Sequence, residues 1–171
     1  MAVALYLDTD RGWTIPLTLR PSTLQHHGGQ ICLPGGQIEN GETNEQAALR
    51  EYTEELGVEP IVRSHCGELS RQYVYASDNL VHPVVSIIEP PSTDWVPDPV
   101  EVREVITLPL RMVIEQQFRR TTTKRRRVLQ GPDSVGELTF EAVAIEFEGH
   151  RIWGATALIL DQLAQILQRL A

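Results

Sequence analysis

The segment Arg50–Gly57, "REYTEELG", crowds three glutamates and an arginine into one short stretch ahead of a glycine. On a helix, Glu51 is a neighbour of both Glu54 and Glu55, and like charges at these spacings destabilise the helix. The last turn of a helix also favours cations, because its exposed carbonyl groups carry partial negative charge. A helix with this sequence therefore needs a partner for its carboxylates.

The helix itself is well bounded by its sequence. Thr43 and Gln46 have the Thr-x-x-Gln spacing of a capping box, and Gly57 is a natural helix stop. We expect the three glutamates to lie together on a side next to the buried stripe, and Arg50 to lie one turn from Glu54. The stripe that faces the core comprises Ala48, Leu49, Tyr52 and Leu56.

Strands are expected on both sides of this helix, and a second helix at the end of the chain. The expected strands are Ala2–Leu7, Trp13–Arg20, a short one within Gly28–Gly36, Asn79–Glu89, and a hairpin over Leu138–Trp153 that turns at Glu148–Gly149. Ala155–Leu170 has apolar residues at helical spacing. This order predicts an α/β protein, an α/β/α sandwich around a mixed β-sheet, formed by residues 1–171 as a single domain.

Composition narrows the class of partner. The formal net charge is −8, which argues against nucleic acid and anionic membranes as partners. No apolar run approaches the roughly 18 residues of a membrane span, and the first ten residues lack the features of a secretion signal. Cys32 and Cys66 have no metal-binding or CxxC spacing. These features predict a reduced, cytoplasmic protein.

One segment departs from the acidic composition. The run Arg119–Val128, "RRTTTKRRRV", holds six of the fifteen basic residues. It is interpreted either as a solvated loop or strand edge, since edges are often protected by charge, or as a docking surface for a phosphate-rich substrate.

The carboxylates on the first helix can be a solvated acidic face or a cation site. Hard cations such as Mg²⁺ bind carboxylate and carbonyl oxygens and usually reach substrate phosphates as well. A Gly35–Gly36 pair upstream allows a ligand or metal to approach the backbone closely. Arg50 is expected to orient its glutamate neighbours. The chemistry that fits these residues is metal-assisted attack of water on a phosphoanhydride.

The stretch Gly36–Val58, "GQIENGETNEQAALREYTEELGV", resembles the Nudix box at every fixed position. The resemblance implies a Nudix hydrolase that uses Mg²⁺ or Mn²⁺. It implies metal ligands at Glu51, Glu54 and Glu55 and at the Gly36 carbonyl, and a structural role for Glu42. Tyr52 stands where the family usually has an aliphatic residue, and we expect this difference to be absorbed by packing.

The flanks resemble the coenzyme A pyrophosphatase branch of that family. Leu17–Gly36, "LTLRPSTLQHHGGQICLPGG", is similar to the segment that precedes the box in this branch. This implies substrate-binding roles for Arg20, His27 and Gln30. Two positions depart from the branch, namely Gln25, where it has arginine, and Leu33, where it has phenylalanine. Glutamine cannot make a bidentate charged contact with phosphate, so the first departure bears on substrate choice.

Other residues have candidate roles outside the box. The resemblance implies that Glu101, or failing it Glu104, is a metal ligand or the base for water. A surface glutamate on a proline-rich loop is the alternative for Glu101. His26 and His27 are expected to orient substrate or backbone, with general-base catalysis as the alternative. Trp153 is expected to be a packing residue, the alternative being a platform for a base.

The expected activity is hydrolysis of coenzyme A or acyl-coenzyme A, a small nucleotide substrate, to 3′,5′-ADP and 4′-phosphopantetheine. Arg50, Glu54, Glu55 and Glu101 are the expected catalytic residues. The alternatives are another nucleotide substrate (NADH, ADP-ribose or a nucleoside triphosphate) and a nucleotide-binding module without catalysis. A homodimer is plausible from the resemblance alone.

Overall fold

The computed structural model describes residues 1–24, 27–74, 77–115, 119–130 and 133–170. Its main sheet has six strands in the order β3-β2-β1-β7-β4, with β8 also pairing with β2. The pair β1–β7 is parallel and the other pairs are antiparallel, so the sheet is mixed, as predicted. Its strands are β1 (Ala2–Asp8), β2 (Gly12–Leu19), β3 (Ile31–Cys32), β4 (Val62–Glu68), β7 (Val84–Ile88) and β8 (Glu104–Pro109).

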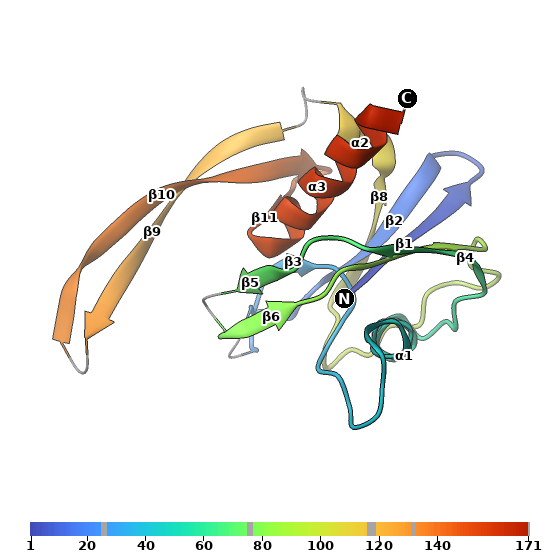
Figure 1. Cartoon of the computed structure of the whole chain (residues 1–171), viewed down its shortest axis with the longest axis horizontal. Coiled ribbons are helices and arrows are strands. Elements are labelled where there is room, and N and C mark those ends of the chain that lie inside the picture. Colours follow the sequence, from blue (N-terminus) through green and yellow to red (C-terminus); the bar gives the residue numbers. More distant parts are fainter. Residues whose placement is uncertain (25–26, 75–76, 116–118, 131–132, 171) are drawn as a thin grey trace.

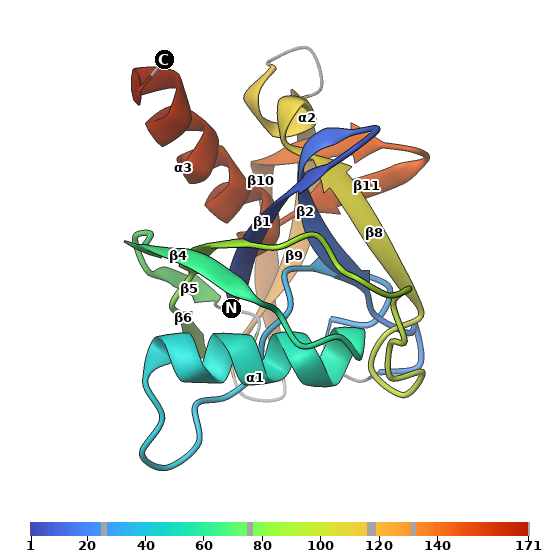
Figure 2. The same ribbon diagram turned by 90° about the vertical axis from the view of Figure 1, so that its right-hand side faces the viewer.

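Strand β1 separates two hydrophobic cores, because successive side chains of a strand point to opposite faces. Ala2, Ala4 and Tyr6 pack with α1 (Asn44–Leu56), whereas Val3 and Leu5 pack with α3 (Ala155–Leu170). Helix α1 thus lies on one side of the sheet and α3 on the other (Figure 2). A short helix, α2 (Leu110–Ile114), packs beside α3. The predicted α/β/α sandwich around a mixed sheet is confirmed.

The predicted ends of α1 are also confirmed. Thr43 and Gln46 form both hydrogen bonds of the capping box, and Gly57 adopts a left-handed conformation with φ of 68°. A methyl group on Gly57 would lie 2.0 Å from the Val96 carbonyl oxygen, so glycine is required for space as well as for backbone conformation. Tyr52 is buried and makes an edge contact with Trp95, which is the packing adjustment expected at this position.

The predicted strand Asn79–Glu89 is wrong as a single element. It forms two strands, β6 (Asn79–Val81) and β7, which are separated at His82 and Pro83. Proline lacks the N–H group that a central strand would donate, so the run breaks there. Strand β6 pairs with β5 (Gln72–Val74) in a separate hairpin. The elements β4, β5, β8 and α2 were not predicted.

A second sheet has the order β11-β10-β9 and comprises β9 (Arg119–Gln130), β10 (Asp133–Phe147) and β11 (His150–Trp153). The predicted hairpin is confirmed, since Phe147 pairs with His150 across the turn. The ribbon formed by β9 and β10 extends away from the main sheet (Figure 1). The basic run lies on β9, at the edge of this sheet. Its side chains lie outside the described part of the chain, so the two interpretations of the run stay open.

Candidate active site

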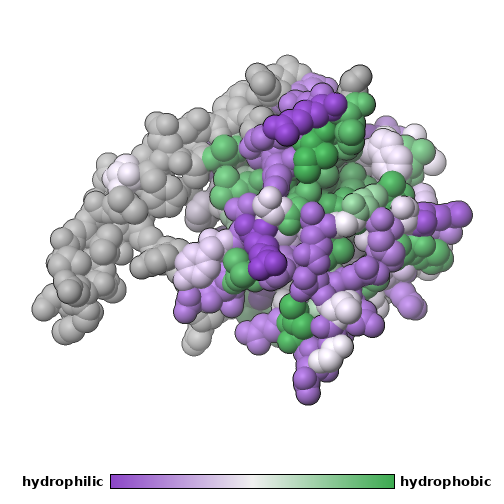
Figure 3. Space-filling model, viewed as in Figure 1, coloured by the Kyte–Doolittle hydropathy of each residue, from purple (hydrophilic) through white to green (hydrophobic). Residues whose placement is uncertain are grey.

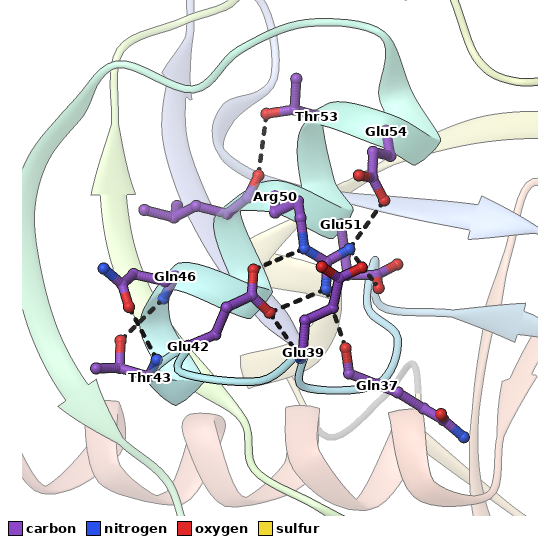
Figure 4. Close-up of polar contacts among 10 residues, drawn as sticks. Gln37, Glu39, Glu42, Thr43, Gln46, Arg50, Glu51, Thr53 and Glu54 are labelled. Carbon is purple, nitrogen blue, oxygen red and sulfur yellow. Dashed lines mark hydrogen bonds and ion pairs between the residues drawn. The ribbon is translucent and has the colours of Figure 1, made fainter.

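One guanidinium group connects three carboxylates at the outer side of α1 (Figure 4). Arg50 Nε and Nη2 donate to the two carboxylate oxygens of Glu42 at 2.7 and 3.1 Å. Arg50 Nη1 donates to Glu51 Oε1 and to Glu54 Oε2, both at 2.9 Å. Arg50 Nη2 also donates to the Gln37 carbonyl oxygen at 3.0 Å, which ties the preceding loop to the helix.

The Arg50 contacts reduce the repulsion between glutamate carboxylates that the sequence predicts. Arg50 lies between Glu51 and Glu54, so their negative charges are partly offset by a cation of the chain itself. Hydrogen bonds from Arg50 hold the pKa of Glu42 below its ordinary value. Glu42 therefore has the contacts of a residue that fixes the loop to the helix, the role the resemblance implies for it.

Gly36 lies directly against the carboxylate of Glu51. A methyl group on Gly36 would be 2.1 Å from Glu51 Oε1 and 2.5 Å from Oε2. A side chain at this position would displace the carboxylate from where it lies. The main chain at Gly36 and the Glu51 carboxylate therefore adjoin one another, as expected for two oxygen ligands of one cation.

Glu55 is buried at the edge of the apolar stripe of α1, where it is a neighbour of Glu51 on the helix. The side chain of Glu55 is 2% exposed, that of Glu51 is 14% exposed and that of Glu54 is 58% exposed, so the three glutamates range from buried to exposed. Glu55 accepts a hydrogen bond from Thr18 Oγ1 at 3.2 Å and lies 3.7 Å from Arg20 Nη1. Burial raises the pKa of Glu55 to about 7, despite the Gly35 N–H group and Arg20, which lower it. The side that holds the three glutamates thus runs from the exposed surface, at Glu54, to the part of α1 that faces β2, at Glu55.

Glu101 lies on a loop that is fastened to the end of α1. The N–H groups of Val96 and Asp98 donate to the carbonyl oxygens of Leu56 and Glu55 at 3.1 and 3.3 Å. Glu101 is exposed, and its charge contributes to the raised pKa of Glu55. By contrast, Glu104 begins β8 and lies 3.4 Å from His150 Nε2. The loop therefore brings Glu101 near the helix, while Glu104 pairs elsewhere.

The expected substrate-binding residues line one cleft of ≈ 880 Å³, within the usual range for a small-molecule site. Arg20, His27, Gln30 and Gly36 are all part of its lining, as is Trp153. His27 has a positive φ of 58°, and its Nδ1 atom lies 3.0 Å from Gln30 Oε1. Gly36 lies against the Glu51 carboxylate and also lines the cleft, so the cleft passes beside Glu51, although Glu51 is not itself one of the lining residues.

Two expected residues lie outside the described part of the chain, Gln25 and His26. Leu33, the other departure from the branch pattern, is buried in the core. Trp153 is half-buried as well as cleft-lining, which is compatible with both of its expected roles.

The residues fit a hard divalent cation. No three acidic, histidine or cysteine side chains within the described residues are already gathered around one point that could hold a metal ion. Two of the box glutamates are engaged with Arg50, and Glu55 is turned toward β2. However, the donors are carboxylate oxygens, one of which lies directly against the main chain at Gly36, and this donor set suits Mg²⁺ or Mn²⁺.

Comparison with known proteins agrees with this geometry. The family model described as "NUDIX domain" matches residues 1–130. The chain belongs to the Nudix family. Members of this family act on pyrophosphate bonds and generally use divalent metal ions, so the chain is a Nudix hydrolase.

Curated relatives span several Nudix hydrolases. Nudix hydrolase 3 of Caenorhabditis elegans is 30% identical over 90% of this chain and 67% of its own. The peroxisomal coenzyme A diphosphatase NUDT7 of Mus musculus is 35% identical over 58% of this chain and 42% of its own. The chain thus spans less than half the length of the second relative. No helix among the described residues could cross a membrane.

The fold is shared with solved Nudix structures. An Ap4A hydrolase of C. elegans superposes with a TM-score of 0.51 and 16% identity, over 64% of this chain and 77% of its own. At this level of identity the likeness shows the fold alone.

Four contacts of the site were not predicted from the sequence. Thr18 bonds Glu55 from β2, the Gln37 carbonyl oxygen accepts from Arg50, and Asn44 bonds both Glu68 and His82. Each joins elements that are distant in the chain or depends on a loop path. Thr18 alone carried a signal, because a hydroxyl in the middle of an apolar strand needs a partner when buried.

Proposed function

We propose that this Nudix hydrolase cleaves the diphosphate of coenzyme A or acyl-coenzyme A, giving 3′,5′-ADP and 4′-phosphopantetheine. The observation that carries the proposal is that Gly36, which lies against the Glu51 carboxylate, also lines a cleft large enough for a nucleotide derivative. The sequence before the box supports the coenzyme A branch, and so does the partial similarity to a coenzyme A diphosphatase.

The proposed metal-binding groups are the Glu51, Glu54 and Glu55 carboxylates and the Gly36 carbonyl. A bound Mg²⁺ or Mn²⁺ would neutralise phosphate charge and lower the pKa of water. Arg50 holds Glu51 and Glu54 in place through one nitrogen, Nη1, and so presets their positions. Arg50 is thus a positioning residue for these two carboxylates.

The proton balance requires a base near the helix. Water adds to one phosphorus, the bridging P–O bond breaks, and the leaving phosphate departs with the bridging oxygen. We assign the proton of the attacking water to the carboxylate of Glu101, which is exposed and lies on the loop fastened to α1. Arg20 is assigned to the substrate phosphates, since it lines the cleft beside Glu55.

Another nucleotide substrate is the second candidate. One observation favours it: Arg20 is the only lysine or arginine among the described residues that line the cleft, and it already lies 3.7 Å from Glu55. Coenzyme A carries a 3′-phosphate that NADH and ADP-ribose lack. These two substrates would therefore need less positive charge in the cleft.

The test is a substrate panel. The purified protein is incubated with Mg²⁺ or Mn²⁺ and with coenzyme A, NADH, ADP-ribose or a nucleoside triphosphate, and products are identified by mass. We expect masses of 3′,5′-ADP and 4′-phosphopantetheine from coenzyme A. Intact coenzyme A beside a cleaved alternative would show that the substrate is wrong. A panel left wholly intact would favour a binding module. The single domain over residues 1–171, the homodimer and the cytoplasmic location stay predictions.

A further inference from the structure

A separate polar cluster of three residues lies at the start of α1. Asn44, the first residue of α1, donates from Nδ2 to Glu68 Oε1 at 2.8 Å. The same nitrogen lies 3.1 Å from His82 Nδ1. Glu68 ends β4, and His82 lies between β6 and β7, so three separate elements meet here. Asn44 and His82 both line the cleft.

These contacts fix the donor that His82 can offer. The Glu68 carboxylate only accepts hydrogen bonds, so the Asn44 atom that faces it is the amide nitrogen. That nitrogen also donates to His82 Nδ1, and the neutral imidazole therefore carries its proton on Nε2. His82 is left with one hydrogen-bond donor on the other side of its ring. Its side chain is 22% exposed, so the ring keeps some access to solvent.

The surroundings of His82 select for an uncharged partner. The Glu68 carboxylate, 3.7 Å from His82 Nδ1, opposes the approach of a phosphate. The cleft beside His82 is lined by the amides of Gln72 and Asn79 and by aliphatic side chains such as Val81. Apolar side chains also gather over α3 (Figure 3), whose first residues form another part of the lining. This end of the cleft suits an arm that has both hydrogen-bond acceptors and methyl groups.

We propose that His82 Nε2 donates a hydrogen bond to an amide or hydroxyl oxygen of the pantetheine arm, and that Asn44 and Glu68 hold the ring for this purpose. The inference rests on the proposed coenzyme A activity and adds the direction in which the substrate lies. Pantetheine is uncharged, and it has two amides, a hydroxyl and a pair of methyl groups. The nucleoside half, with its 3′-phosphate, then lies away from Glu68.

The two products provide a test that does not depend on turnover. Binding of 4′-phosphopantetheine and of 3′,5′-ADP is measured by calorimetry in wild type and in His82→Phe, which keeps a ring but has no donor. We expect His82→Phe to bind 4′-phosphopantetheine about 5- to 10-fold more weakly, as for the loss of one neutral hydrogen bond. Binding of 3′,5′-ADP should stay unchanged. His82→Gln, which restores an N–H donor, should recover most of the affinity.

His65 offers a matched control. Its Nε2 lies 2.8 Å from Glu45 Oε1 and its Nδ1 lies 3.3 Å from Ser86 Oγ, and it is not among the residues that line the cleft. His65→Phe should bind both products as wild type does. Weaker binding of 3′,5′-ADP to His82→Phe, or equal effects of the two histidine changes, would overturn the assignment.

Turnover of coenzyme A by the wild type separates this inference from the proposed function. If the wild type cleaves coenzyme A and His82→Phe binds both products normally, only the role of His82 fails. If the wild type leaves coenzyme A intact, both fail.

Discussion

The carboxylates on the outer and the inner side of helix α1 have different surroundings. On the outer side, Glu51 and Glu54 share the guanidinium of Arg50, which also binds Glu42 through two hydrogen bonds. On the inner side, Glu55 is buried under β2, and its cationic neighbour, Arg20, is 3.7 Å away. Consequently the outer negative charges are partly offset by Arg50, whereas burial raises the pKa of Glu55 to about 7. The ion pairing and the pKa of a carboxylate on this helix therefore depend on the element that packs against it.

The largest expected effect is a loss of turnover, and it tests whether Glu54, on the outer side of α1, and Glu55, on the inner side, both act in the same reaction. Glu54→Gln and Glu55→Gln should each reduce kcat by more than about 100-fold, because loss of a metal ligand should exceed the usual effect of losing a supporting residue. Steady-state kinetics with the cleaved substrate measures this, with circular dichroism as the check on folding. Near-normal turnover in both variants would contradict the assignment of a metal site spanning the two sides.

The next effect concerns the outer side alone. Arg50→Ala should lower activity by about 10- to 100-fold, because Glu51 and Glu54 lose the group that positions them. It should also lower the melting temperature in chelator, since three carboxylates are left facing one another. Arg50→Lys should recover only part of both, because an ammonium group cannot donate from three nitrogens as Arg50 does. Full activity of Arg50→Ala would show that Arg50 does not position the catalytic carboxylates.

The inner side predicts a pH dependence of stability in the metal-free protein. The pKa of Glu55 rises from 4.5 to about 7 on folding, so the folded chain binds more protons between these values. The free energy of unfolding should therefore fall as pH increases through this window, by at most about 3 kcal/mol. Urea denaturation at pH 5 and pH 8 in chelator measures the fall.

Glu55→Gln is the control for that experiment. Glutamine cannot titrate, so the variant should lose less stability than wild type between the two pH values. Arg20 and Glu101, the other charged groups acting on Glu55, are unchanged in it. Parallel pH profiles for the two proteins would show that the stability change arises elsewhere.

The smallest effect concerns the cysteines. Cys66 is exposed, whereas Cys32 lies beside Arg20 and Glu55, and burial raises its pKa to about 11. At pH 8 only about one Cys32 in a thousand is then a thiolate. A disulfide reagent should label Cys32→Ser quickly and Cys66→Ser slowly. Equal labelling rates for the two variants would show that burial does not control the reactivity of Cys32.

Local sequence rules predicted the parts of the molecule that depend on neighbours in the chain. The capping box at Thr43, the stop at Gly57 and the turn at Glu148–Gly149 all have partners within a few residues. The break at Pro83 belongs to the same class, because proline in an apolar run argues against a continuous strand. The prediction of one strand there gave too much weight to the β-branched residues.

The burial of Glu55 could not be predicted in this way. A helix wheel places Glu55 between the apolar stripe and the other glutamates, and only the position of β2 decides which group it joins. The same holds for Asn44, Glu68 and His82, which come from α1, β4 and the turn before β7. Their contacts depend on sheet order, which no short segment specifies.

The carboxylates beside Gly36 and part of the cleft lining come from different elements of the fold. The carboxylates near Gly36 come from α1 and the loop before it, whereas another part of the cleft lining is formed by β5, β6 and the start of α3. A change in the hairpin Gln72–Val81 can thus alter which molecule is accepted while leaving the residues for bond cleavage intact. This division allows a lineage to acquire new substrates by exchanging a surface hairpin, and a protein engineer can use the same route.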